Sequence, residues 1–231
     1  MKFKRDTKFD SLFDKIPNLR WIPYVGPNFI KQEKRIFVFA HNIPSKAEEY
    51  EKRIQEFSKR SYWADCIEEY TYCKGYWTEA FRYFIKGAVG LSKNYDINSD
   101  EDVRYKVDTF VSKIAYLNYI QDLVIGENKN ANATAEQHEI SRQVNHDFLE
   151  ILNVTHCICW GSQVFNSLKS IDGFAVESER SEGMKGFSSA IIRRPNGKKM
   201  NCLKVFHPSM PGYKPFSEST HKIFEDFLTR D

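Results

Sequence analysis

The chain has 231 residues, of which 41% are apolar, 28% are charged and 15% are aromatic. These fractions are ordinary for a globular protein and argue against intrinsic disorder, and the length favours one domain spanning residues 1–231. The 34 Lys and Arg residues outnumber the 31 Asp and Glu residues only slightly, which leaves a net charge of +3. A nucleic-acid partner would therefore need a locally basic face, because the protein as a whole is not strongly basic.

The beginning of the chain, MKFKRDTKFDSLFDKIP, is charged throughout and does not resemble a signal peptide. No window approaches the roughly 18 consecutive apolar residues of a membrane helix. We therefore expect a cytoplasmic protein with no membrane partner. No Cys-x-x-Cys pair occurs, so we interpret the cysteines as reduced structural thiols and expect no metal and no other cofactor. The five cysteines are Cys66, Cys73, Cys157, Cys159 and Cys202.

Short apolar runs alternate with segments of helical periodicity along the chain. Strands are expected at residues 35–40 (RIFVFA), 112–120 (SKIAYLNYI), 156–160 (HCICW) and 201–206 (NCLKVF). Helices are expected around residues 47–57, 140–151, 163–168 and 218–228. This alternation predicts an α/β fold, a three-layer α/β/α sandwich around a central, mostly parallel, four-stranded sheet.

Two segments interrupt the alternation. Residues 60–95 are dense in aromatic side chains, and we expect a helical insert that lines one side of a cleft. Residues 172–189 are rich in Gly, Ser and Glu and are typical of a long loop. After that loop, Asn196-Gly197 separates two apolar runs and predicts a β-hairpin that carries Arg193 and Arg194 near its tip. We expect the tip to lie near the strand ends that carry the other candidate residues, where it is either a solvated turn or a DNA contact.

In an open parallel sheet, ligands bind beyond the carboxyl ends of the strands. The residues that follow the expected strands are therefore candidates for a site. They are His41 and Asn42, Asn118 within the second strand, Gly161 and Ser162, and His207. No Ser or Cys nucleophile with a partner base stands out, and the chain has no Gly-rich phosphate loop.

In this order, the segments resemble the uracil-DNA glycosylase superfamily over roughly residues 20–229. The closest similarity lies in CICWGSQVFNSL and in CLKVFHPSMPGYKPFSESTHKIF, which contains a His-Pro-Ser motif followed by a helix. LNYIQDLV is similar to the strand that bears the base-reading Asn of the family. FVFAHNIP resembles the water-positioning loop only loosely, with Ala40 and Ile43 where relatives have Gly and Pro.

The resemblance implies a role for each matched residue. His207 would donate a hydrogen bond to O2 of the departing pyrimidine, and Asn42 would position the attacking water. Asn118 would bind the flipped base, with His41 as a second base-binding candidate. The resemblance also implies contacts to DNA through Ser209, the backbone of Gly161 and Ser162, and a wedge at Met210 or Tyr213.

Structural roles are the alternatives at these positions. His207 could bind a backbone carbonyl at the end of its strand, and Asn118 could be a buried structural amide. Asn42 could cap the helix that follows, although Ser45 is also a suitable cap. His41 could simply pack or form a local hydrogen bond, and Trp160 is expected in the core.

The resemblance predicts a monofunctional DNA glycosylase that acts on double-stranded DNA as a monomer. Relatives that are specific for uracil carry a Tyr that blocks substituents at C5, and Pro44 occupies that position here. The substrate is therefore either uracil or a C5-modified cytosine, such as the glucosylated hydroxymethylcytosine of phage DNA. Because the first motif is degenerate, the alternative is a catalytically inactive DNA- or nucleotide-binding protein that retains the fold.

Overall fold

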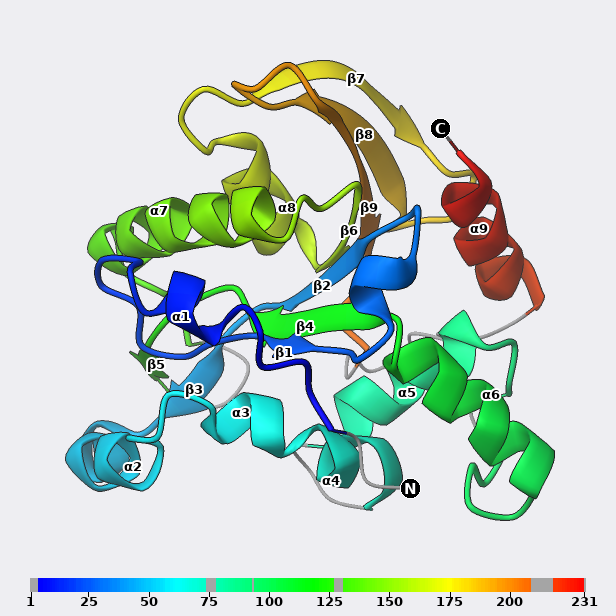
Figure 1. The fold of residues 1–231 in the computed structure, drawn as a ribbon, viewed down its shortest axis with the longest axis horizontal. Helices are drawn as coiled ribbons and strands as arrows, with labels where there is room; N and C mark the ends of the chain where they lie inside the picture. Colours follow the sequence, from blue (N-terminus) through cyan, green and yellow to red (C-terminus); the bar gives the residue numbers. More distant parts are fainter. Residues whose placement is uncertain (1–3, 74–77, 93, 127–130, 209–217, 231) are drawn as a thin grey trace.

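In the computed structural model, a mixed seven-stranded sheet forms the centre of the molecule and helices cover both of its faces (Figure 1). The structure describes residues 4–73, 78–92, 94–126, 131–208 and 218–230. In their order across the sheet, the strands are β1 (Tyr24–Val25), β4 (Ile114–Asn118), β2 (Ile36–Ala40), β6 (His156–Trp160), β9 (Lys199–Val205), β8 (Ser188–Arg193) and β7 (Ala175–Ser181). The central strands β4, β2, β6 and β9 run parallel, whereas β1, β8 and β7 are antiparallel to their neighbours.

The prediction of an α/β protein with a mostly parallel central sheet is confirmed, and the four predicted strands correspond to β2, β4, β6 and β9. The prediction of a four-stranded sheet is wrong, because β1 extends one side and the β8–β7 pair extends the other. The predicted hairpin is confirmed as β8 and β9.

The prediction of a loop over residues 172–189 is also wrong, since β7 lies there. All residues of β7 are exposed, so the strand has no alternation of apolar and polar residues that would reveal it. Backbone pairing with β8 and cross-strand charges stabilise it instead. Glu177, at a bulge in β7, forms ion pairs with Arg193 and with Lys199, and Lys199 Nζ lies 3.1 Å from the carboxylate.

One face of the sheet, the α5 face, carries the side chains of Tyr116 and Trp160. The helices on this side are α3 (Tyr62–Asp65), α4 (Ile67–Tyr72), α5 (Glu79–Ala88), α6 (Glu101–Val111) and α9 (Glu218–Thr229). Phe81 of α5 lies 4.6 Å from the ring of Tyr116, and Phe84 lies 5.4 Å from Trp160, both between ring centroids. The aromatic insert is therefore helical, as predicted, and much of it packs into the core.

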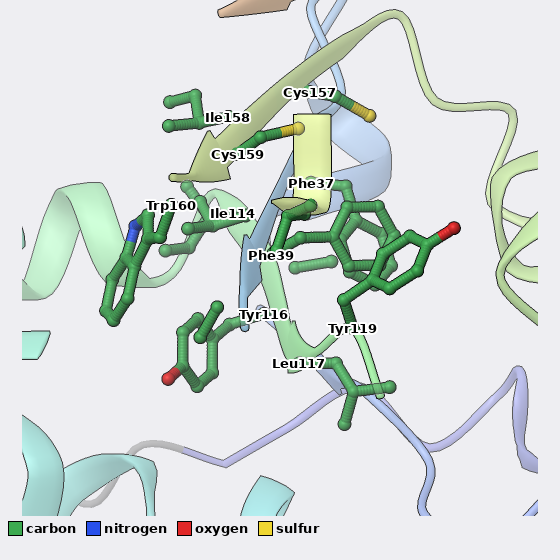
Figure 2. Close-up of a cluster of buried hydrophobic side chains, with 14 of the residues drawn as sticks. Phe37, Phe39, Ile114, Tyr116, Leu117, Tyr119, Cys157, Ile158, Cys159 and Trp160 are labelled. Carbon is green, nitrogen blue, oxygen red and sulfur yellow. The ribbon is translucent and has the colours of Figure 1, made fainter. Parts of the chain in front are cut away.

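The opposite face, the α7 face, carries Phe37, Phe39 and Cys157, as Figure 2 shows. Its helices are α1 (Asp10–Phe13), α7 (Ala135–Ile151) and α8 (Ser162–Lys169). A capping box fixes the start of α7, with Thr134 and Gln137 each bonding the backbone of the other. Phe148 of α7 stacks on Phe37 at 6.4 Å, so this layer is held by apolar contact.

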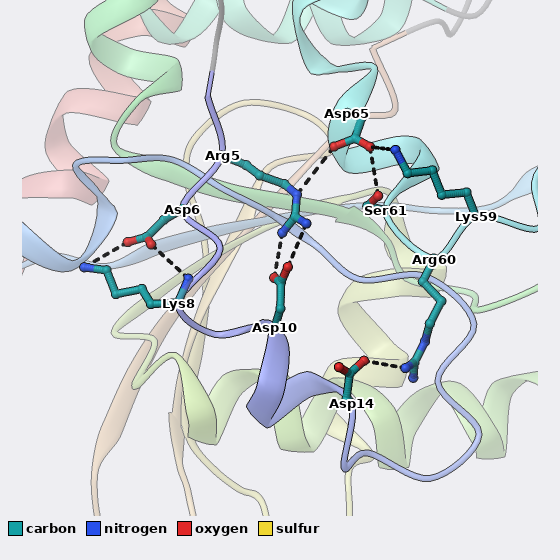
Figure 3. Close-up of polar contacts among 9 residues, drawn as sticks. All are labelled: Arg5, Asp6, Lys8, Asp10, Asp14, Lys59, Arg60, Ser61 and Asp65. Carbon is teal, nitrogen blue, oxygen red and sulfur yellow. Dashed lines mark hydrogen bonds and ion pairs between the residues drawn. The ribbon is translucent and has the colours of Figure 1, made fainter.

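The remaining elements are short. They are η1 (Phe29–Lys31), η2 (Ala47–Glu49), α2 (Tyr50–Glu56), and β3 (Ile43–Ser45) paired in parallel with β5 (Leu123–Ile125). Arg5 ties the N-terminal segment to the insert: it binds both carboxylate oxygens of Asp10, and its Nε lies 3.5 Å from Asp65 (Figure 3). No helix in the described part of the chain has the length and apolar character needed to cross a membrane.

An ion pair joins the last residues of the described chain to the strand extension. Arg230 donates hydrogen bonds of 2.8 and 2.7 Å to the two oxygens of Glu182, whose side chain is 9% exposed. The hydrogen bonds from Arg230 outweigh burial and lower the pKa of Glu182 to about 2.

We predict that Glu182→Gln lowers the free energy of unfolding at pH 7 by about 1.5–3 kcal/mol, the range for a hydrogen bond to a charged group. The pKa of Glu182 is lower in the folded chain than its ordinary value of 4.5. Its contribution is therefore present above pH 4.5 and is lost as the pH falls towards 2. Urea unfolding at pH 7 and pH 3 tests this, and an equal difference between variant and wild type at both values would contradict it.

Candidate functional site

The four parallel strands end at the same level, and the segments that follow them meet at one edge of the sheet, the carboxyl edge. Ala40 at the end of β2 pairs with Asn118 at the end of β4, and Trp160 at the end of β6 pairs with Val205 at the end of β9. The amide of Gly161 then donates to the carbonyl of Val205 at 2.7 Å. The candidate segments therefore lie together, as expected from a parallel sheet.

Two histidines come together at the carboxyl edge. His207 stands edge-on to Trp160, with the ring centroids 5.6 Å apart. Burial, and then the nearby His207 and His138, lower the pKa of His41 to about 4, while a hydrogen bond with Gln163 partly opposes this. The His41 ring is therefore uncharged at neutral pH, and no described residue hydrogen-bonds to its buried Nε2.

Asn42 is anchored through its amide nitrogen. Its Nδ2 donates to the carbonyl of Ala131 at 3.1 Å, which leaves Oδ1 as a hydrogen-bond acceptor. The first helical element after it begins at residue 47 with Lys46 as the N-cap residue, and no side chain caps it. The alternative in which Asn42 or Ser45 caps this helix is therefore wrong.

Asn118 is the last residue of β4 and is 7% exposed. Its side chain forms no hydrogen bond within the described residues. Its amide atoms are not among the fully enclosed polar atoms, so they can reach a polar ligand at this edge.

Gly161 forms the sharp turn between β6 and α8. Its φ of 89° and ψ of 167° define a conformation that is essentially restricted to glycine. A Cβ atom there would meet nothing within 4 Å, so the turn borders open space. No acidic residue lies in the first turn of α8, whose N-terminal amides together with Ser162 could bind a phosphate.

The tip of the β8–β9 hairpin lies at the opposite edge. The turn precedes β9, and β9 runs parallel to β6, so Arg193 and Arg194 lie near the amino ends of the parallel strands. The expectation that they lie beside the other candidates is wrong. Arg194 is 2% exposed and donates to the carbonyl of Leu149 at 2.9 Å, which stabilises the C-terminal end of α7. Arg193 is paired with Glu177.

Three of the predicted DNA-binding residues, Ser209, Met210 and Tyr213, lie outside the described residues. Within the described part of the chain, all five cysteines are free thiols, and no three His, Cys, Asp or Glu side chains form a metal-binding cluster. Burial raises the pKa of Cys159 and of Cys202, so these core thiols are poor metal ligands and poor nucleophiles.

A separate hollow of about 350 Å³ lies along α7 and contains none of the residues at the carboxyl edge. Its lining is Pro17, Glu139, Arg142, Gln143, His146, Asp147, Ile171 and Asp172. The candidate site is therefore defined by the convergence of strand ends and not by this hollow.

Sequence reasoning missed several neighbours of the site. Tyr116 lies two residues before Asn118 on the same face of β4, a position that strand alternation could have indicated. Gln163 and His138 approach His41 from α8 and α7, and only the packing of those helices brings them there.

No family model matches the chain, and no curated protein matches it either.

We predict that His41 makes stability depend on pH between about 4 and its ordinary value of 6.5. In this interval the unfolded chain binds a proton that the folded chain excludes, so stability falls by at most about 1.4 kcal/mol for each unit of decreasing pH. In urea unfolding at pH 7 and pH 5, the His41→Gln variant should lose less stability than the wild type. Parallel losses in the two proteins would contradict the prediction.

We predict that Gly161→Ala lowers the free energy of unfolding by about 1–3 kcal/mol because of its backbone conformation. If the α8 amides bind a phosphate of DNA, as the family resemblance implies, the same substitution should weaken binding of duplex DNA, since a methyl group then occupies the space in front of them. Gly197→Ala is the matched control: its φ is 79° and it also borders open space, but it lies in the β8–β9 turn. Fluorescence anisotropy with labelled DNA should show weaker binding for Gly161→Ala alone, and equal affinity of both variants would exclude a phosphate site there.

Proposed function

We propose that this protein is a monofunctional DNA glycosylase with a uracil-DNA glycosylase-like fold. It flips a pyrimidine out of double-stranded DNA and hydrolyses its N-glycosidic bond, which leaves an abasic site. The convergence of His207, the His41–Asn42 segment, Asn118 and the Gly161–Ser162 turn at one edge of the sheet is the observation that carries the proposal.

The chemistry matches these residue types. Cleavage of the N-glycosidic bond leaves negative charge on the base and positive charge on the sugar. A donor at His207 that is aimed at the developing oxyanion stabilises the transition state more than the ground state. One such donor is typically worth about 2.7–4 kcal/mol of activation free energy. Asn118 holds the flipped base through its otherwise unpaired amide.

The attacking water is oriented by Asn42 Oδ1. An amide is nearly non-basic, so Asn42 cannot remove a proton, and stabilisation of the leaving base supplies most of the acceleration. None of the matched positions is Lys, so no Schiff base forms with the sugar and the DNA strand is not cleaved. The reaction needs no cofactor.

DNA binding rests on phosphate contacts at the carboxyl edge. Flipping a base costs a few kcal/mol, which phosphate contacts and a wedge residue must offset. The α8 amides behind Gly161 and Ser162 supply one phosphate contact, and Ser209 with Met210 or Tyr213 completes the set. One copy of the chain suffices for this chemistry.

The base is uracil or a C5-modified cytosine such as the glucosylated hydroxymethylcytosine of phage DNA. Pro44 replaces the Tyr that would exclude a substituent at C5, and the amide of Asn118 can match either kind of Watson–Crick edge. The test is to incubate the protein with uracil-containing DNA, unmodified DNA and phage DNA with bulky cytosines, and to identify the released base by mass.

A second candidate, a binding protein without catalysis, is favoured by the degenerate first motif, in which Ala40 and Ile43 stand where relatives have Gly and Pro. Such a protein would bind DNA with marked salt dependence and would form no alkali-labile abasic sites in any of these substrates. Formation of abasic sites by the purified wild type decides between the two.

We predict that His207→Ala lowers the rate of abasic-site formation by about 10²–10³-fold, the effect of removing one oxyanion donor, while DNA affinity changes little. His146→Ala is the matched control, because His146 lies on α7 and lines the separate hollow. Alkali cleavage of end-labelled DNA under single-turnover conditions measures the rate. A rate of abasic-site formation in His207→Ala equal to that of the wild type would contradict the proposed mechanism.

A further inference from the structure

Two largely buried tyrosines near the carboxyl edge have hydroxyls that form no hydrogen bond within the described part of the fold and are not among its fully enclosed polar atoms. Tyr116 on β4 is 5% exposed and Tyr70 on α4 is 8% exposed. Neither forms a hydrogen bond within the described residues. A tyrosine hydroxyl that no group of the fold occupies and that keeps accessible surface can donate to and accept from a bound ligand.

Tyr116 lies on the same strand as the candidate base-binding residue, and Tyr70 is linked to Tyr116 through Phe81. Tyr116 and Asn118 project from the same face of β4, about 6.6 Å apart along the strand. The ring of Phe81 lies between the two tyrosines, 4.6 Å from Tyr116 and 6.3 Å from Tyr70. Figure 2 shows Tyr116 and Trp160 on the same side of the sheet, and Trp160 in turn contacts His207.

Further unpaired polar atoms lie around this pair. Nε1 of Trp63 and Nε of Arg82 are buried with no hydrogen-bond partner among the described residues. The Trp63 ring lies 6.2 Å from that of Tyr70, and Arg82 follows Phe81 on α5. The insert therefore presents more hydrogen-bonding groups to the interior of the α5 face than the fold itself satisfies.

The chemistry of these groups favours one class of ligand. Burial raises the pKa of both Tyr70 and Tyr116, so each remains a neutral hydroxyl that can donate and accept. A methyl group or bare uracil would leave these hydroxyls unpaired. A hydroxyl-bearing substituent would pair with them, and sites built in this way discriminate strongly against ligands that lack the hydroxyl.

We propose that the hydroxyls of Tyr70 and Tyr116 hydrogen-bond a hydroxyl-bearing substituent of the base held by Asn118, and so determine specificity for that substituent. This inference rests on the proposed glycosylase function and assigns a specificity role to the aromatic insert. Tyr70 and Tyr116 do not contact the reacting atoms.

The experiment uses three DNA duplexes with one modified base each: uracil, 5-hydroxymethylcytosine, or 5-hydroxymethylcytosine with a hexose on its hydroxyl. Single-turnover rates of abasic-site formation are measured for the wild type, Tyr70→Phe, Tyr116→Phe and Tyr119→Phe. Tyr119→Phe is the matched control, because the hydroxyl of Tyr119 also has no hydrogen-bond partner among the described residues, but it is enclosed and its ring packs against Phe39 on the α7 face.

We expect the wild type to release at least one of the hydroxyl-bearing bases. Each of Tyr70→Phe and Tyr116→Phe should reduce the ratio of the rate on that base to the rate on uracil by about tenfold, the effect of losing one hydrogen bond. Tyr119→Phe should leave this ratio unchanged. Affinities for 2′-fluoro duplexes, which resist hydrolysis, should show the same pattern, and urea unfolding should confirm that the variants fold.

The outcomes separate the two proposals. Release of uracil alone by the wild type, or equal losses on all bases in the tyrosine variants, would overturn the specificity role and leave the glycosylase function intact. Release of no base by the wild type would overturn the glycosylase function and this inference with it.

Discussion

The candidate site depends on the register of the four parallel strands, which brings their last residues side by side. Ala40 is paired with Asn118, and Trp160 with Val205, so the chain leaves all four strands at one edge. A shift of one residue in any strand would turn its side chains to the other face and move its last residue by about 3.3 Å. The register is fixed because each strand is buried on both faces and every residue of β2, β4 and β6 lies in the interior.

The two faces of the sheet differ in how they are filled. The α7 face is closed by close apolar contacts, in which Phe37 lies 4.2 Å from Phe39 and stacks on Phe148 of α7. The α5 face combines aromatic rings with buried polar atoms of the insert that the described part of the fold leaves unpaired, Nε1 of Trp63 and Nε of Arg82. The α7 face also holds an unpaired buried atom, the hydroxyl of Tyr119, so the cost in stability is not confined to one face.

Much of the fold could be predicted from the sequence because buried parallel strands form continuous apolar runs. HCICW became β6 with unchanged boundaries, and RIFVFA became β2 with one residue fewer. β7 was missed because AVESERS has no apolar stripe, and its pairing with β8 rests on backbone hydrogen bonds and cross-strand charges. Asn196-Gly197 identified the hairpin but could not locate its tip, which lies at the amino edge because β9 itself is parallel to β6.

The candidate site was predictable as a set of strand ends, whereas its electrostatics were not. The pKa of His41 depends on burial and on His207 and His138, which lie more than 90 positions away in the sequence. Because a charge on His207 disfavours a charge on His41, the two rings cannot both be protonated cheaply. The buried ring of His41, with a pKa of about 4, is the one that stays neutral. In the mechanism that we propose, His207 would donate to the developing anion, while the neutral His41 would add no positive charge beside the cationic sugar.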